Sequence, residues 1–258
     1  AFLFLGLLAA ATPLLGEAGA LATLAIIVLA VLGTGIIGAA LYAVVLRPFH
    51  GRSQLMVLVA TVALGIVIRQ SVRHIVPQGS TAQAFPTMLT GTAFSVGGTD
   101  VSWFVPVTVL ATLALMAAMY VILTHTLTGT RIRALAQDPE VAQLMGISTV
   151  RIAMLTFFMA SAVGAVGGVF FAAEIGAIRF DYGVLFGLLG FSSAVIGGLG
   201  SVVGAIIGAL IVGTVQTIAQ IFLPAGPAYQ QVVAFLVVIA FLVFRPTGLL
   251  GEKVVEKV

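Results

Sequence analysis

Residues 129–148 read GTRIRALAQDPEVAQLMGIS and form a polar segment in a chain that is otherwise strongly apolar. The chain is 61% hydrophobic and 7% charged, and its mean hydropathy is +1.25. Apolar runs of the length that crosses a bilayer, about 20 residues, recur on both sides of this segment. The sequence therefore predicts an all-α, polytopic membrane protein that carries a structured polar connection near its middle.

The apolar segments predict a bundle of about seven or eight transmembrane helices in a single domain that covers residues 1–258. The break GGLGS at 197–201 leaves open whether 184–223 forms two full spans or helices that partly re-enter the membrane. The predicted segments are 1–15, 20–46, 54–76, 103–124, 152–174, 184–200, 203–223 and 228–244.

The basic residues predict which loops lie in the cytoplasm. Eight of the eleven lysines and arginines cluster in 47–52, 131–151 and 245–257. The loop 77–102, by contrast, has no lysine or arginine and carries Asp100. Counting spans between the loops places 125–151 and the C-terminus in the cytoplasm, and 77–102 and 175–183 outside. The charges are too dispersed to follow a nucleic-acid backbone, so no nucleic-acid partner is expected.

Small residues recur at helical spacing in two segments. Because lipid supplies no hydrophobic drive between helices, small residues that permit close approach favour helix association. We therefore predict helix-packing faces, with ligand contact as the alternative. The glycines of these faces are Gly164, Gly168, Gly200, Gly204 and Gly208.

The polar segment predicts a short capped helix over residues 138–146. Asp138 suits the N-cap, Pro139 the first helical position and Gly146 a left-handed C-terminal residue. Glu140 lies where the helix dipole favours negative charge. One side of the helix is apolar, with Val141, Leu144 and Met145. From spacing alone, the helix either docks onto a partner protein or rests on lipid headgroups.

Charged residues near the predicted outer ends of spans are candidate contacts for a substrate or a partner. Arg69 and Arg73 are four positions apart and share a helix face, where they bind carboxylates or reach outward to headgroups. Glu174 and Asp181 flank the predicted outer turn and contact a basic partner or only solvent. No histidine has a partner at metal-ligand spacing, and the chain has no cysteine, so no metal site is expected.

The segment 129–148 resembles the cytoplasmic loop of ABC importer permeases, and specifically of the branched-chain amino acid permeases of the LivH/LivM family. The matching positions are Arg133-Ala134, Asp138, Ala142 and Gly146-Ile147. The stretches 46–55, 194–213 and 245–251 are similar to other parts of the same family. The ending RPTGLLG favours the LivH-like branch.

This resemblance implies an ABC importer permease fold in which 129–151 is a coupling loop. The implied ATPase-coupling residues are Arg131, Arg133, Ala134, Asp138, Pro139, Glu140, Ala142, Leu144, Met145 and Gly146. The implied partners are ABC ATPase subunits, a second homologous permease chain in a homodimer or heterodimer, a substrate-binding protein and membrane lipid. The implied location is a bacterial or archaeal cell membrane.

The chain contains no Gly-x-x-x-x-Gly-Lys-Ser/Thr loop. We therefore expect a non-enzymatic transport subunit without a cofactor, with ATP and magnesium bound by the partner ATPases. A urea or short-chain amide permease is the nearest alternative, and a sugar permease is more remote. An ion-driven secondary transporter would carry membrane-embedded carboxylates, whereas the acidic residues here lie in loops or at span ends.

Two features depart from the family pattern. Many members carry a lysine where this sequence has Leu189. The family also begins with an additional helix and an Asn-Phe-Ala-His-Gly-type segment, neither of which is found here, so that helix is expected to be missing. Both departures bear on substrate passage.

Overall fold

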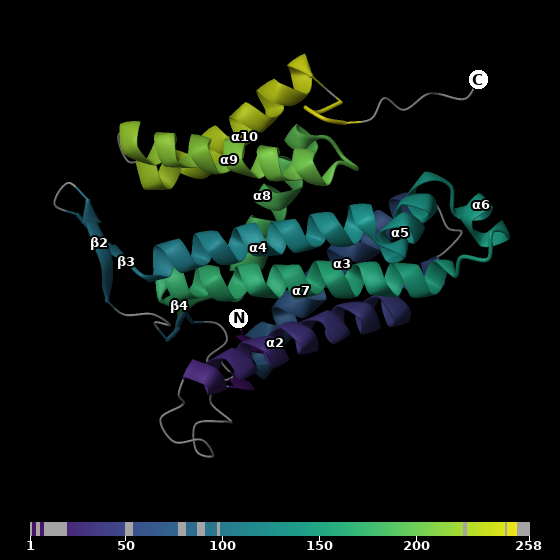
Figure 1. Cartoon of the computed structure of the whole chain (residues 1–258), viewed down its shortest axis with the longest axis horizontal. Coiled ribbons are helices and arrows are strands. Elements are labelled where there is room, and N and C mark those ends of the chain that lie inside the picture. Colours follow the sequence, from purple (N-terminus) through teal and green to yellow (C-terminus); the bar gives the residue numbers. More distant parts are fainter. Residues whose placement is uncertain are drawn as a thin grey trace. The chain divides into compact units, whose positions relative to one another are not determined.

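The helices of the chain fall into two units, residues 1–181 and 182–258 (Figure 1). The predicted first span, 1–15, lies almost wholly outside the described residues, as do Arg52, Lys253 and Lys257. The computed structural model describes residues 2–3, 6–7, 20–49, 54–76, 81–86, 91–96, 99–223, 226–245 and 247–251.

The first unit contains three long helices before its polar connection and one after it. Helix α2 continues into a π-helical turn, η1, and a 3-10 turn, η2. The bounds are α2 Ala20–Leu41, η1 Tyr42–Leu46, η2 Arg47–Phe49, α3 Gln54–Ile75, α4 Phe104–His125, α5 Leu127–Gln137, α6 Pro139–Leu144 and α7 Thr149–Ile175. The second unit contains α8 Tyr182–Gly197, α9 Val202–Phe222 and α10 Gly226–Phe244.

The long helices confirm the predicted polytopic membrane protein. Among the described residues, five helices are long and apolar enough to cross a membrane. They are Thr23–Phe49, Leu55–Ile75, Phe104–His125, Thr149–Ile175 and Val202–Phe222. Two further apolar helices, Tyr182–Gly197 and Ala228–Phe244, are shorter.

Helices α2 and α7 pack along each other and hold the first unit together. Gly35 lies so close to the ring of Phe158 that an added Cβ would stand 2.7 Å from it, and Gly38 lies against Ser161. Small residues on α2 therefore permit this packing. The buried core around it contains Ile26, Ala30, Phe85, Phe104, Val169, Ala172, Ala173 and Ile178.

Two short antiparallel strand pairs lie at one end of the first unit. Strand β1 (Gln83–Ala84) pairs with β4 (Ala177–Ile178), with Gln83 opposite Ile178. Strand β2 (Thr92–Val96) pairs with β3 (Thr99–Ser102), which leads into α4 (Figure 1). The two loops predicted to be external therefore meet at the same end.

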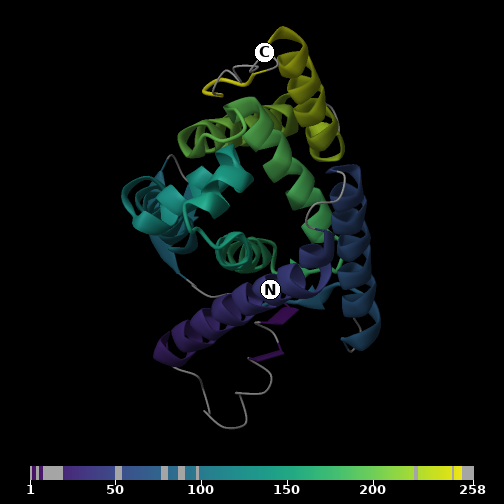
Figure 2. The same cartoon turned by 90° about the vertical axis from the view of Figure 1, so that its right-hand side faces the viewer.

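The opposite end of the first unit carries the connections predicted to be cytoplasmic. The Tyr42 and Phe157 rings lie with centroids 5.0 Å apart, which places the end of α2 beside the first half of α7. Helices α5 and α6 lie beyond the same end of α7 (Figures 1 and 2). The grouping of the loops agrees with the predicted order of spans.

In the second unit, α8 and α9 form a tight hairpin around Gly198–Ser201. Gly197 and Gly204 lie against each other, and Gly208 contacts the Ser193 carbonyl oxygen. A side chain at any of these glycines would collide with backbone. The region 184–223 thus forms two separate helices, of which α9 is long enough to span and α8 has only 16 residues.

The C-terminal segment folds back onto this hairpin. The backbone N–H groups of Leu249 and Leu250 donate to the carbonyl oxygens of Ile196 and Gly197, both at 2.9 Å. These bonds satisfy two carbonyls that the end of α8 leaves free. The segment 247–251 and the α8–α9 turn therefore lie at the same end of the second unit.

In the described part of the chain, only some of the glycines predicted to form helix-packing faces lie against another helix. Gly204 and Gly208 contact α8, whereas a Cβ at Gly164 would meet nothing within 4 Å among the described residues. Gly200 lies outside any helix, because α9 begins at Val202, and its φ of +95° serves the turn instead. Its assignment to a helix face is therefore wrong. For Gly164 and Gly168, packing stays a prediction.

Candidate functional site

The connection between α4 and α7 folds into the two short helices α5 and α6. The Thr126 side chain caps α5 by accepting from the Gly129 N–H at 3.2 Å. A Cβ at Gly129 would collide with the carbonyl oxygens of Ile122 and Leu123, so the sharp turn out of α4 requires glycine. Helix α5 is an element that the sequence pattern did not predict.

Helix α6 has the predicted caps. One carboxylate oxygen of Asp138 accepts from the N–H groups of Glu140 and Val141, both at 3.0 Å. Pro139 occupies the first helical position, and Gly146 has a φ of +78°. The Ile147 N–H donates to the Ala142 carbonyl oxygen at 3.0 Å and closes the far end. The short capped helix is confirmed.

The apolar side of α6 faces away from the chain. Ala142 is only 3% exposed and attaches α6 to the described part of the chain. The exposed fractions of Val141, Leu144 and Met145 are 53%, 87% and 77%. Large apolar side chains in this arrangement mark a contact with a protein or a lipid.

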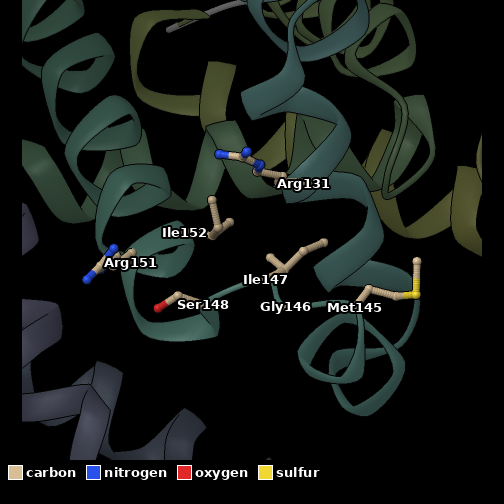
Figure 3. Close-up of a pocket in the computed structure, with 7 residues that line it drawn as sticks. All are labelled: Arg131, Met145, Gly146, Ile147, Ser148, Arg151 and Ile152. Atoms are coloured by element: carbon tan, nitrogen blue, oxygen red, sulfur yellow. The ribbon is translucent and has the colours of Figure 1, made fainter.

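A pocket of about 270 Å³ lies between α5 and the beginning of α7. Figure 3 shows Arg131 reaching from α5 toward Ile152 on α7, with Ser148 and Arg151 side by side at the turn into α7. The lining thus combines two guanidinium groups with apolar side chains. Its residues are Arg131, Met145, Gly146, Ile147, Ser148, Arg151 and Ile152.

The structure brings the ten predicted coupling residues onto one continuous stretch of α5 and α6. Arg133 lies on α5 with a guanidinium nitrogen 3.5 Å from Thr130 Oγ1. The Ala134 carbonyl oxygen accepts from the Asp138 N–H at 3.1 Å and joins the two helices. Arg151 also lines the pocket, and sequence reasoning used it only as a marker of sidedness. The role of these residues in coupling stays a prediction.

The predicted outer residues lie at the other end of the first unit. The Arg73 guanidinium lies 5.7 Å from the centre of the Phe180 ring, which joins the end of α3 to the turn after β4. Arg179 pairs with one carboxylate oxygen of Asp181 at 2.9 Å. The contact between Arg73 and Phe180 was not predicted, because it joins two segments that lie far apart in the sequence.

Three buried polar atoms near this outer end have no hydrogen-bond partner among the described residues. They are Nε of Arg69, Oγ1 of Thr108 and the second carboxylate oxygen of Asp181. Glu174, on the last turn of α7, is exposed. The outer end of the first unit therefore carries both cationic and anionic side chains. Their contact with a substrate or a binding protein stays a prediction.

Comparison with known proteins gives one family and several relatives. The family described as "Branched-chain amino acid transport system / permease component" matches residues 1–242. The permease protein BraD of a high-affinity branched-chain amino acid transport system in Pseudomonas aeruginosa is 33% identical over 230 residues. That match covers 87% of this chain and 73% of BraD.

Two Escherichia coli K12 proteins are also similar. LivH, a permease protein of a high-affinity branched-chain amino acid transport system, is 32% identical over 217 residues, or 82% of this chain and 69% of LivH. AraH, an L-arabinose transport system permease protein, is 27% identical over 150 residues, or 55% of this chain and 45% of AraH. No solved structure matches the chain.

Proposed function

The chain belongs to the family of branched-chain amino acid transport system permease components. We propose that it is the permease subunit of an ATP-driven ABC importer and carries leucine, isoleucine and valine across a cell membrane. Its apolar helices make it a membrane protein. The observation that carries the substrate class is the identity of 32–33% to two branched-chain amino acid permeases over most of the chain.

Helix α6 is the proposed contact with an ATPase subunit. Its N-cap lies within its own segment, because Asp138 accepts from the Glu140 and Val141 N–H groups. Its exposed leucine and methionine suit a groove on another protein. ATP-driven closure of two ATPase subunits would push on α6 and favour one arrangement of the spans, because a ligand shifts an equilibrium only by its differential affinity.

The proposed partners follow from this arrangement. They are two ABC ATPase subunits, which hold ATP and magnesium, a second homologous permease chain and a substrate-binding protein. Under this proposal, the 125–151 loop and the C-terminus lie in the cytoplasm. The Arg69, Arg73 and Asp181 region then lies outside, where a loaded binding protein arrives. The basic loops at one end of the first unit support this orientation.

Uptake by the reconstituted transporter tests this function. Vesicles that contain the permease, its ATPases and its binding protein are loaded with ATP and given radiolabelled leucine or radiolabelled urea. We expect leucine to accumulate only when ATP is present, and unlabelled isoleucine and valine to compete. Accumulation of urea without leucine would contradict the substrate and keep the permease architecture. Leucine uptake that follows an ion gradient without ATP would contradict the ABC mechanism.

A further inference from the structure

Among the described residues, no carboxylate forms a salt bridge with the arginines of the pocket between α5 and α7. In the part of the chain that the structure describes, the one salt bridge joins Arg179 to Asp181, far along the chain from Arg131 and Arg151. The connection carries two acidic residues: Asp138 uses its carboxylate to cap α6, and Glu140 forms no salt bridge within the described residues. The pocket therefore presents two positive charges that nothing within these residues neutralises.

The lining of this pocket suits a phosphate group attached to an apolar body. Guanidinium groups match the geometry of phosphate oxygens and bind them with charge-assisted hydrogen bonds. The hydroxyl of Ser148 adds a further donor beside Arg151 (Figure 3). Ile152 lies between the two arginines in Figure 3, and Ile147 adds a second apolar side chain to the lining. A small inorganic anion would leave this apolar surface unused.

The pocket lies at the ends of helices that are long enough to span a membrane, and if these helices span, that is the level of the lipid headgroups. Helix α4 ends at His125 and α7 begins at Thr149, and both helices are long and apolar enough to cross the membrane. The pocket lies against the first turn of α7, where this span begins. Basic pockets between transmembrane helices at the cytoplasmic side are known to bind anionic headgroups.

We infer that the pocket formed by Arg131, Ser148 and Arg151 binds the phosphate of an anionic phospholipid in the membrane leaflet at that end. The assignment of that leaflet to the cytoplasm rests on the proposed function, whereas the binding itself does not. Val141 and Leu144 of α6 do not line the pocket. A phospholipid there leaves these two side chains free for a protein partner, and its phosphate links α5 to α7 at the base of α6.

Lipid retention measured on the purified transporter complex tests the inference. The complex is exchanged into mixtures of phosphatidylglycerol and phosphatidylcholine, and the bound lipid is counted by native mass spectrometry. The variants are Arg131→Gln and Arg151→Gln. The matched control is Arg47→Gln, which removes one positive charge from the same end of the first unit but does not line the pocket.

We expect the wild-type complex to retain phosphatidylglycerol in preference to phosphatidylcholine. Each pocket variant should weaken this retention roughly five-fold, the effect of about one basic residue near an anionic surface. Arg47→Gln should retain phosphatidylglycerol as the wild type does. Equal retention of the two lipids, or an equal loss in the Arg47→Gln control, would overturn the inference.

Two further arms separate other occupants of the pocket. If inorganic phosphate binds with the same arginine dependence while phosphatidylglycerol does not, the site takes free phosphate and the lipid assignment is wrong. If the pocket variants lose the ATPase subunits with unchanged lipid retention, the arginines bind a partner protein instead. Retention of phosphatidylglycerol by a complex that does not transport leucine would support the pocket and contradict the proposed function.

Discussion

The backbone N–H of Leu249 donates a hydrogen bond to the carbonyl oxygen of Ile196 at 2.9 Å, so the C-terminal segment closes the end of α8. The segment can approach this closely because glycines face each other across the contact. Gly248 lies against the backbone of Gly198, and Gly251 also lies against Gly198. Residues 247–251 therefore close the end of α8 and pack against the turn that leads to α9.

Replacing Gly248 with alanine should destabilise this closure. Gly248 has a φ of +78°, which alanine rarely adopts, and an added Cβ would collide with the backbone of Gly198. The variant must therefore strain its backbone and move away from Gly198. We expect a loss of about 1–3 kcal/mol in the free energy of unfolding. Thermal unfolding followed by circular dichroism would measure it. The control is Gly190→Ala in α8, where a Cβ meets nothing within 4 Å. Equal unfolding temperatures for the two variants would contradict this role of the segment.

Loss of the Asp138 carboxylate should uncouple ATP hydrolysis from transport. Asp138→Ala removes the acceptor of two backbone N–H groups and weakens α6 by about 1 kcal/mol. Asp138→Lys and Gly146→Pro should uncouple more strongly. Lysine at position 138 has no acceptor for these N–H groups, and proline at position 146 cannot adopt the φ of +78° found there. The measurement is leucine transported per ATP hydrolysed, in variants that still insert in the membrane.

The matched control for this prediction is Asp138→Asn. Asparagine also caps helices, so this variant should retain most of the coupling although it loses the charge. If Asn and Ala at position 138 uncouple equally, the charge acts directly and the cap is not the reason. Normal coupling in Gly146→Pro would show that the shape of α6 has no part in energy transfer.

The Leu144 side chain should be required for binding the ATPase and not for folding. It is 87% exposed, so Leu144→Asp leaves the core of the subunit unchanged. If Leu144 fills a groove on the ATPase, the variant should bind it on the order of ten-fold more weakly. Leu127→Asp is the control, because Leu127 is 78% exposed and lies at the start of α5. Equal ATPase affinity in the two variants would favour a helix that rests on lipid.

The Arg73 side chain should contribute to receiving the loaded binding protein. Arg73→Gln removes one cation from the outer end of α3, and loss of one exposed ion pair weakens a contact roughly two- to five-fold. The KM for the binding protein should rise by that factor while the maximal rate of uptake changes little. Gln70→Ala, on the preceding turn, should leave the KM unchanged. An unchanged KM in Arg73→Gln would mean that this arginine only reaches toward headgroups.

The order of the spans could be predicted from the sequence, because long apolar runs and the distribution of arginines are local signals. The caps of α6 were equally readable, since Asp138, Pro139 and Gly146 act through neighbouring backbone groups. Helix α5 could not be predicted in the same way, because its short run of alternating apolar and basic residues gives no clear helical period. Its start depends on Gly129 packing against the end of α4.

Contacts between distant segments could not be predicted from one sequence. The pairing of β1 with β4 joins residues about ninety positions apart, and two-residue strands give no periodic signal. The same holds for Gly35 and Gly38, which pack against α7, and for Arg131 and Arg151, which line one pocket from different helices. Spacing predicted Gly200 on a helix face, but the turn uses it at a positive φ.

ATP hydrolysis by the reconstituted transporter tests whether the chain is the permease subunit of an ABC importer for branched-chain amino acids. The complex receives its binding protein with leucine, isoleucine or valine in one series and with urea in another. We expect that each branched-chain amino acid stimulates hydrolysis, that urea does not, and that Leu144→Asp reduces the stimulation. Stimulation by urea alone would contradict the substrate, and ATPase subunits that bind wild type and Leu144→Asp equally would contradict the role of α6.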